Sequence, residues 1–277
     1  MEIEHFIRAA IEEDIGAGDH TSLACIPEAR LSKAEIIARG NGVIAGIEIA
    51  RKVFEIIDPD LAVEPVFRDG DMVEREDMVM LIRGRARSIL KAERVVLNFM
   101  QRMSGISTLT RKYVKAVEGF PVKILDTRKT TPLFREFEKL AVKIGGGENH
   151  RMGLYDMIMI KDNHIAYAGG IKPAIQAVRH YLEANNLSLK IEIETSSLEE
   201  VQEVIATGGV HRIMLDNFKI PVVKKAVKLI NKSCEIEVSG GITLESVRDY
   251  AACGVDYISV GALTHSYKSL DLSLEAI

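Results

Sequence analysis

The chain has 277 residues, of which 47% are hydrophobic and 27% charged, and its formal net charge is −4. This composition is typical of a globular protein with one large core or two domains, and the acidic balance gives no support for a nucleic-acid partner. No stretch reaches the roughly 18 uninterrupted apolar residues of a membrane span, and the acidic N-terminal segment does not resemble an export signal. Cys25, Cys234 and Cys253 form no CxxC pair, which argues against disulfides and cysteine metal sites and favours the cytoplasm.

The first 118 residues are predicted to form an N-terminal α+β sandwich domain with its connecting helices. An amphipathic segment opens the chain, strands are expected at residues 34–40 and 61–67, and helical spacing covers residues 46–58. Residues 88–118 have the spacing of two successive helices. Ser88 is a plausible N-cap there, and the segment SGIST at residues 104–108 suggests a break between the two helices.

From residue 119 to residue 277 a strand-then-helix unit repeats, with the extreme C-terminus a candidate to return to the first domain. The apolar runs lie at residues 122–126, 155–160, 189–194, 212–216, 235–239 and 256–261. The last four begin roughly 23 residues apart, which is the length of a compact βα unit. This pattern predicts parallel strands covered by helices.

Charged residues or glycines follow each predicted strand. They are Asp126, Arg128 and Lys129; Lys161, Asp162 and His164; Glu192 and Glu194; Asp216 and Asn217; Ser239, Gly240 and Gly241; and Gly261 with His265 just beyond. A βα barrel builds its active site at the carboxyl ends of its strands. Six units fall short of eight, so the predicted fold is α/β with an incomplete (β/α) barrel, and a doubly wound sheet is the alternative.

Basic side chains crowd the first half of the repeat region although the whole chain is acidic. They are Arg128, Lys129, His150, Arg151, Lys161 and His164. Parallel strands covered by helices offer no solvated face for such residues, so a pocket for a small polyanion is favoured over ordinary surface cations. The glycines of VSGGIT and SVGALT follow the last two strands, where barrels commonly hold phosphate, although tight turns are the simpler explanation.

Carboxylates stand between these two groups. Glu192 and Glu194 lie two residues apart on one strand, and Asp216 ends the next strand. Hard oxygen ligands without cysteine suit Mg²⁺ better than zinc, and ion pairing with nearby lysines is the alternative. The whole set fits chemistry at a sugar carbon that carries phosphates, with carboxylates stabilising positive charge and Mg²⁺ neutralising a departing pyrophosphate.

Motifs along the whole chain resemble those of the quinolinate phosphoribosyltransferases, also called carboxylating nicotinate-nucleotide pyrophosphorylases. In order they are EDIGAGDHTS, AERVVLN, SGIST, DTRKTTP, EKLAVKIGGGENHR, IMIKDNH, IEIE, LDN, VSGGI and GVDYISVGALTHS. The resemblance implies an N-terminal α/β sandwich joined to an incomplete α/β barrel. It also implies conversion of quinolinate and phosphoribosyl pyrophosphate to nicotinate mononucleotide, pyrophosphate and CO₂, with Mg²⁺, in NAD biosynthesis.

The resemblance also implies roles for individual residues. Arg128, His150, Arg151 and Lys161 line the pocket for the quinolinate dicarboxylate, Lys129 contacts the pyrophosphate, Glu194 and Asp216 contact the ribose and its Mg²⁺, and Ser239, Gly240, Gly261 and His265 hold the 5-phosphate. Lys129, Lys161, Glu194 and Asp216 are the expected catalytic residues. Arg94 matches an arginine that reaches the neighbouring subunit's site, which implies an obligate homodimer.

Two departures and two rival functions accompany this prediction. Leu133 stands where the family usually has glycine, and Leu140 replaces a common tyrosine, which affects the expected shape of the loop more than the reaction.

A nicotinate phosphoribosyltransferase would need fewer cations for its monocarboxylate substrate. A silent relative that only binds a phosphorylated ligand should have lost Glu194, Asp216 or Lys161, and all three are present.

Overall fold

The structure is a computed structural model that describes residues 3–277 and divides into two compact units. The first unit combines the segments up to Arg111, Glu136–Gly146 and Ser266–Ile277, and the second combines Lys112–Arg135 and Gly147–His265. The segments Glu136–Gly146 and Ser266–Ile277 therefore belong to the first unit, whereas the sequence pattern predicts a boundary after residue 118 and lets only the extreme C-terminus return. Among the described residues, no helix is long and apolar enough to cross a membrane.

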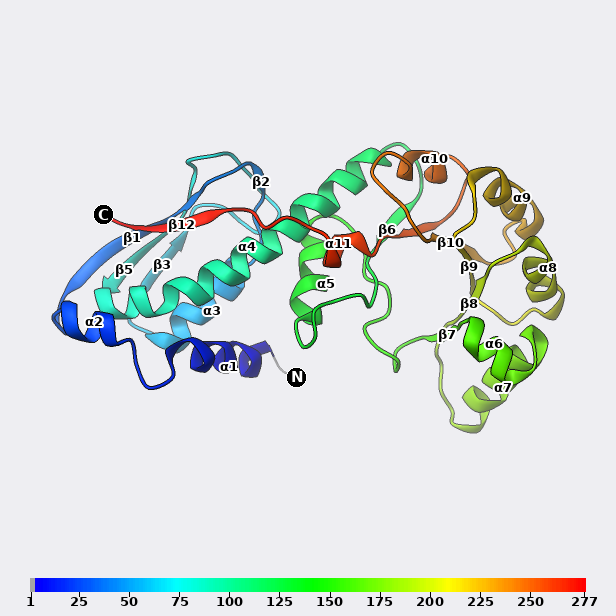
Figure 1. Ribbon diagram of the computed structural model, residues 1–277, viewed down its shortest axis with the longest axis horizontal. Helices are drawn as coiled ribbons and strands as arrows, with labels where there is room; N and C mark the ends of the chain where they lie inside the picture. Colours follow the sequence, from blue (N-terminus) through cyan, green and yellow to red (C-terminus); the bar gives the residue numbers. More distant parts are fainter. Residues whose placement is uncertain (1–2) are drawn as a thin grey trace. The chain divides into compact units, whose positions relative to one another are not determined.

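The first unit contains a four-stranded antiparallel sheet with the strand order β12-β1-β5-β3 (Figure 1). Its strands are β1 (Leu31–Ala38), β3 (Ala62–Pro65), β5 (Met78–Arg85) and β12 (Leu272–Ala276), and β2 (Gly42–Val43) pairs with β4 (Met72–Val73). In β1 every second side chain from Ala34 to Ala38 is buried, as alternation in a half-covered strand requires. The last strand, β12, pairs with β1, so the C-terminal segment completes this sheet.

Helices supply the rest of the first unit's core. They are α1 (Ile3–Ile15), α2 (His20–Cys25), α3 (Ile47–Ile57), α4 (Ala86–Ala116), of which the last turn lies in the second unit, and α5 (Arg135–Ile144). Phe137 of α5 has its ring centroid 5.0 Å from those of Phe6 in α1 and Phe99 in α4. This spacing is favourable for aromatic packing, so α5 is held in the first unit through its aromatic side chain.

The predicted break in the long helix is wrong, because α4 is one continuous helix of 31 residues. Its small residues Ser104, Gly105 and Ser107 serve close packing instead. A Cβ on Gly105 would lie 2.8 Å from the Cα of Ser269. The Ser104 hydroxyl accepts the N–H of Ala45 at 2.9 Å, and Ser107 donates to the carbonyl of Ala141 at 2.7 Å. Ser88 is not the N-cap; it lies inside α4 and donates to Asp58 at 2.6 Å.

The second unit is built on a six-stranded parallel sheet with the order β6-β11-β10-β9-β8-β7. The strands are β6 (Lys123–Leu125), β7 (Ile158–Ile160), β8 (Ile191–Thr195), β9 (Arg212–Asp216), β10 (Glu235–Ser239) and β11 (Tyr257–Ser259). Between and after them come α6 (Asp162–Ala168), α7 (Ile171–Ala184), α8 (Leu198–Thr207), α9 (Ile220–Ile230), α10 (Val247–Ala251) and α11 (Ala262–His265). Helices α7 to α10 lie outside the curved sheet (Figure 1).

The six strands stop short of a closed barrel. Within the described residues β6 and β7 are the two edges of the sheet, and the loop before β7 runs beside β6 instead. Glu148 bridges to Leu125 in parallel, with its N–H donating to the carbonyl of Ile124 at 2.8 Å. The predicted fold class, an incomplete (β/α) barrel with an N-terminal α+β domain, is confirmed, and this loop leads directly to His150 and Arg151.

Candidate active site

A cavity of about 750 Å³ lies within the second unit at the carboxyl ends of its strands. Of the residues to which the family resemblance gave roles, all except Arg94 line it: Arg128, Lys129, His150, Arg151, Lys161, Glu194, Asp216, Ser239, Gly240, Gly261 and His265. Arg94 is exposed on α4 of the first unit, so its expected role in a neighbouring subunit stays a prediction. The structure thus brings residues from all six strand ends to one space.

Two guanidinium groups form the cationic side of this cavity. Arg151 is only 9% exposed, and burial, followed by the charge of Arg128, lowers the pKa of its guanidinium. The Nε of Arg128 is buried and has no hydrogen-bond partner among the described residues. Two close arginines, one with an unused donor, are suited to a ligand with more than one negative charge, because each guanidinium can bind a carboxylate through two hydrogen bonds.

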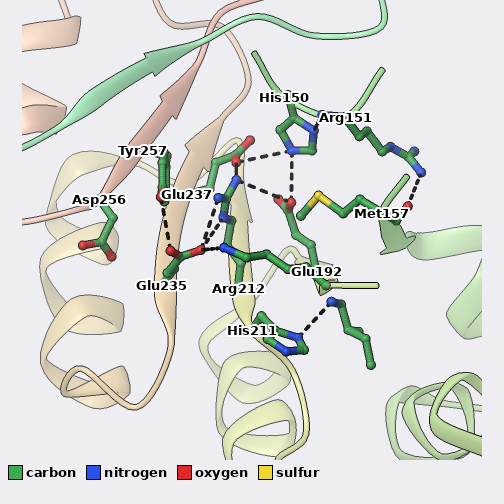
Figure 2. A network of polar contacts seen from close by, with 12 residues as sticks. His150, Arg151, Met157, Glu192, His211, Arg212, Glu235, Glu237, Asp256 and Tyr257 are labelled. Atoms are coloured by element: carbon green, nitrogen blue, oxygen red, sulfur yellow. Dashed lines mark hydrogen bonds and ion pairs between the residues drawn. The ribbon is translucent and has the colours of Figure 1, made fainter. Parts of the chain in front are cut away.

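Side chains hold the main chain at His150 and Arg151. The N–H of His150 donates to Oδ1 of Asp126 at 2.8 Å. The N–H of Arg151 donates to Nδ1 of the His150 ring at 2.7 Å (Figure 2). The other ring nitrogen, Nε2, lies 3.0 Å from Glu192 and 3.4 Å from Glu237. Both nitrogens of His150 are therefore engaged within the protein.

The protonation of His150 is set by opposing effects. Burial lowers the pKa of the ring, but the hydrogen bonds to Glu192 and Glu237 outweigh burial and would raise it to about 9. An imidazolium would, however, carry a proton on Nδ1 that faces the N–H of Arg151. This contact favours the neutral ring with its proton on Nε2. Burial, followed by the charge of Glu237, raises the pKa of the neighbouring Glu192 carboxyl.

The glycine side of the cavity consists of tight turns. Gly240 and Gly241 have φ angles of +94° and +61°, which L side chains rarely adopt. A Cβ on Gly261 would lie 3.1 Å from both Nε2 of His265 and Cδ of Lys129, so these two side chains pack directly over that glycine. Backbone N–H groups beside cationic side chains are suited to binding a phosphate.

Carboxylates occupy the space between. Lys161 Nζ is 2.5 Å from Glu194, and Asp216 accepts from the side-chain amide of Asn217 at 2.6 Å. Glu194 and Asp216 both line the cavity and offer hard oxygen ligands, so they fit a magnesium ion by donor chemistry. His164, in contrast, does not line this cavity, and its Nδ1 accepts the N–H of Lys161 at 3.0 Å.

The sequence prediction missed several residues of the site. Thr127, Glu237 and Ser259 also line the cavity, and Arg212 contacts Glu237. Glu237 lies two residues before Ser239 on the same strand and therefore on the same face. The alternation in EIEVS could thus have predicted that Glu237 faces the cavity. Arg212 opens its strand, at the end away from the expected chemistry, so no strand-end rule identifies it.

The chain matches two domain families along its length. The N-terminal domain of quinolinate phosphoribosyl transferase matches residues 19–104, and its C-terminal domain matches residues 106–275. A protein of Nicotiana tabacum named quinolinate phosphoribosyltransferase [decarboxylating] 2b, mitochondrial, is 47% identical, covering 99% of this chain and 82% of that protein. A probable nicotinate-nucleotide pyrophosphorylase [carboxylating] of Bacillus subtilis is 43% identical, covering 99% and 93%.

Solved structures agree with these sequence matches. The crystal structure of NadC from Streptococcus pyogenes has a TM-score of 0.94 and 40% identity, and the match covers 99% of this chain and 97% of that one. The nicotinate-nucleotide pyrophosphorylase of Ehrlichia chaffeensis has a TM-score of 0.94 and 38% identity, with coverage of 100% and 99%. Both the sequence and the fold are thus matched over nearly the whole chain.

Proposed function

The chain belongs to the quinolinate phosphoribosyltransferase family, and from this premise we propose how its cavity carries out the family's reaction. The reaction transfers a phosphoribosyl group from phosphoribosyl pyrophosphate to quinolinate with decarboxylation, and gives nicotinate mononucleotide, pyrophosphate and CO₂. One observation carries the proposal. Arg128 and Arg151 line one side of the cavity, and the glycine turns at 240–241 and 261 line the other.

Quinolinate binds on the arginine side of the cavity. Arg128 and Arg151 receive its two carboxylates, and their planar donors fix the ring so that its nitrogen faces the sugar. Lys161 lies between this side and Glu194, to which it is bound at 2.5 Å, so it reaches both substrates. Holding the two reactants in this relative position supplies much of the rate acceleration, because the entropy cost of bringing them together is met when they bind.

The phosphoribosyl donor binds on the glycine side. The turns at Gly240 and Gly261, with Ser239 and His265, hold the 5-phosphate, and Lys129 contacts the pyrophosphate. As the ring nitrogen attacks the anomeric carbon, the bond from that carbon to the pyrophosphate oxygen breaks, pyrophosphate leaves with the electron pair, and positive charge develops on the sugar. Glu194 and Asp216 line the same cavity and stabilise that charge at short range.

A bound Mg²⁺ would be held by Glu194 and Asp216 and would neutralise charge on the pyrophosphate. The chain's own residues perform the remaining work. After transfer the ring nitrogen is positively charged, and loss of the neighbouring carboxylate as CO₂ leaves an electron pair that this charge stabilises until the carbon takes up a proton from water. The protein therefore needs to hold the ring in place more than it needs to supply an acid or a base for this step.

We further propose a homodimer and a cytoplasmic location. The exposed position of Arg94 on α4 supports a role outside its own subunit. Three unpaired cysteines, Cys25, Cys234 and Cys253, support a reducing compartment. The plant relatives are named mitochondrial or chloroplastic, so a reducing organelle is the alternative compartment.

The test of function supplies the protein with phosphoribosyl pyrophosphate, Mg²⁺ and either quinolinate or nicotinate. We expect CO₂ and nicotinate mononucleotide from quinolinate, with a lower rate from nicotinate because a monocarboxylate leaves one arginine unpaired. Turnover of nicotinate alone would refute the proposed substrate. A parallel reaction without divalent cation tests the magnesium requirement, and full activity in the presence of a chelator would refute it.

A further inference from the structure

We propose that Glu237 and Arg212 are positioning residues for quinolinate binding, acting through the His150 ring to hold the main chain of Arg151 in place. The inference rests on the proposed role of Arg151 as a carboxylate ligand. It also changes the expected role of His150, from a direct ligand of the substrate to a support for the residue that follows it.

The engaged nitrogens of His150 are the first step of the argument. Nδ1 accepts the N–H of Arg151 at 2.7 Å, while Nε2 faces Glu192 at 3.0 Å and Glu237 at 3.4 Å. Neither nitrogen can bind a substrate carboxylate without giving up a partner inside a region where His150 is only 9% exposed. The ring instead links the sheet to the peptide group between residues 150 and 151.

The sheet end of this link is rigid (Figure 2). Glu237 is fully buried in β10 and accepts from Nη1 of Arg212 at 2.7 Å. Arg212 is itself held by Glu235, with Nη2 at 3.2 Å, and by the ring of Tyr257, whose centroid is 3.8 Å from the guanidinium carbon. A buried group fixed on three neighbouring strands provides a firm base for the imidazole.

The loop end depends on this link. β7 does not begin until Ile158, so residues 150 and 151 have no strand partner in the described part of the chain, and their N–H groups donate to Asp126 and to the His150 ring. If the ring rotates, the N–H of Arg151 loses its acceptor. The guanidinium is then free to move within the cavity, and displacement of a positioning group by about 1 Å can cost a large part of the rate.

A second use of the same cluster can be weighed against this one. Ligand atoms of His150, Glu192 and Glu237 lie within 4.8 Å of one another, a spacing that could hold a metal ion. Arg212, however, already places its guanidinium 2.7 Å from Glu237 and 3.7 Å from Glu192. The positive charge that these carboxylates need is therefore supplied by the chain, and a divalent cation beside the guanidinium would be repelled.

The experiment compares Glu237→Gln with Glu235→Gln. Both glutamates lie on β10 and both pair with Arg212, but Glu237 faces His150 whereas Glu235 is bound to Tyr257. We expect Glu237→Gln to raise KM for quinolinate about 10-fold or more, with KM for phosphoribosyl pyrophosphate within about twofold. Glu235→Gln removes one support of Arg212 but leaves Glu237 in contact with His150 and Arg212, so it should raise KM for quinolinate by less than about threefold. Equal effects of the two variants, or equal effects on the two substrates, would overturn the proposal.

A measurement on the unmodified protein guards against a variant that does not fold. In a ¹⁵N-histidine NMR spectrum, with the signal assigned by its loss in His150→Gln, we expect His150 to carry its proton on Nε2 and none on Nδ1. A proton on Nδ1 in the folded enzyme would refute the link to Arg151. Absence of any quinolinate turnover by the unmodified enzyme would instead refute the proposed function and is recorded separately.

Discussion

The glycine turn after β10 offers a prediction whose size follows from local geometry. In Gly240→Ala the added Cβ would lie 2.6 Å from Cγ and 2.8 Å from the backbone nitrogen of Asn217, and would also overlap its Oδ1. The φ of +94° adds backbone strain of about 1–2 kcal/mol, and forcing the neighbour aside adds about 1–3 kcal/mol. We therefore expect a loss of about 2–5 kcal/mol in the free energy of unfolding.

Gly241→Ala is the matched control, because it makes the same substitution one residue further along. Its φ is +61°, but apart from its two chain neighbours no described residue has an atom within 4 Å of the added Cβ, so only the backbone strain of about 1 kcal/mol applies. Urea unfolding measures both losses, and the KM for phosphoribosyl pyrophosphate should rise more in Gly240→Ala, since Asn217 lines the same cavity. Equal losses of stability in the two variants would refute the steric argument.

Three further predictions address other parts of the molecule. Arg151→Ala should lower kcat/KM for quinolinate by roughly 30-fold to several-thousand-fold with an unchanged circular dichroism spectrum, and near-normal turnover would remove the substrate assignment. Leu133 has a φ of +63° and is 77% exposed, so Leu133→Gly should raise the free energy of unfolding by about 0.5–1 kcal/mol in the same urea assay, and a decrease would contradict the strain. The Arg85 hydrogen bonds lower the pKa of Asp58 to about 2 from 3.8, so the stability they add is present above about pH 4 and lost as pH falls toward 2. Asp58→Asn should therefore cost about 1–2 kcal/mol at pH 6 and much less near pH 2, and a cost independent of pH would disprove this origin.

The parallel strands could be predicted from the sequence because their physics is local. A strand buried on both faces appears as a short apolar run, and all six runs correspond to strands. The carboxyl ends of parallel strands meet at one edge, so residues such as Lys161 and Asp216 could be grouped without knowledge of the structure. The expectation of glycine at position 133 also rests on local physics. The backbone there has a positive φ, which glycine adopts more easily than Leu133 does.

Other features could not be predicted because their causes are distant in the chain. The segment around Gly105 has the composition of a helix break, but its small side chains make room for the backbone at Ser269, which a local pattern cannot reveal. Arg212 and Glu237 have charges that would normally be placed on a surface. Only the pairing of β9 with β10 shows that they neutralise each other inside the barrel.

The pairing of β1 with β12 has a consequence for biosynthesis. β1 lies between β5 and β12, so its second neighbour leaves the ribosome only when more than two hundred further residues have been made. Until then β1 has one open edge, which is a template for pairing with other chains. A nascent or truncated chain that ends before Leu272 should therefore aggregate through its N-terminal sheet, even where the barrel residues are all present.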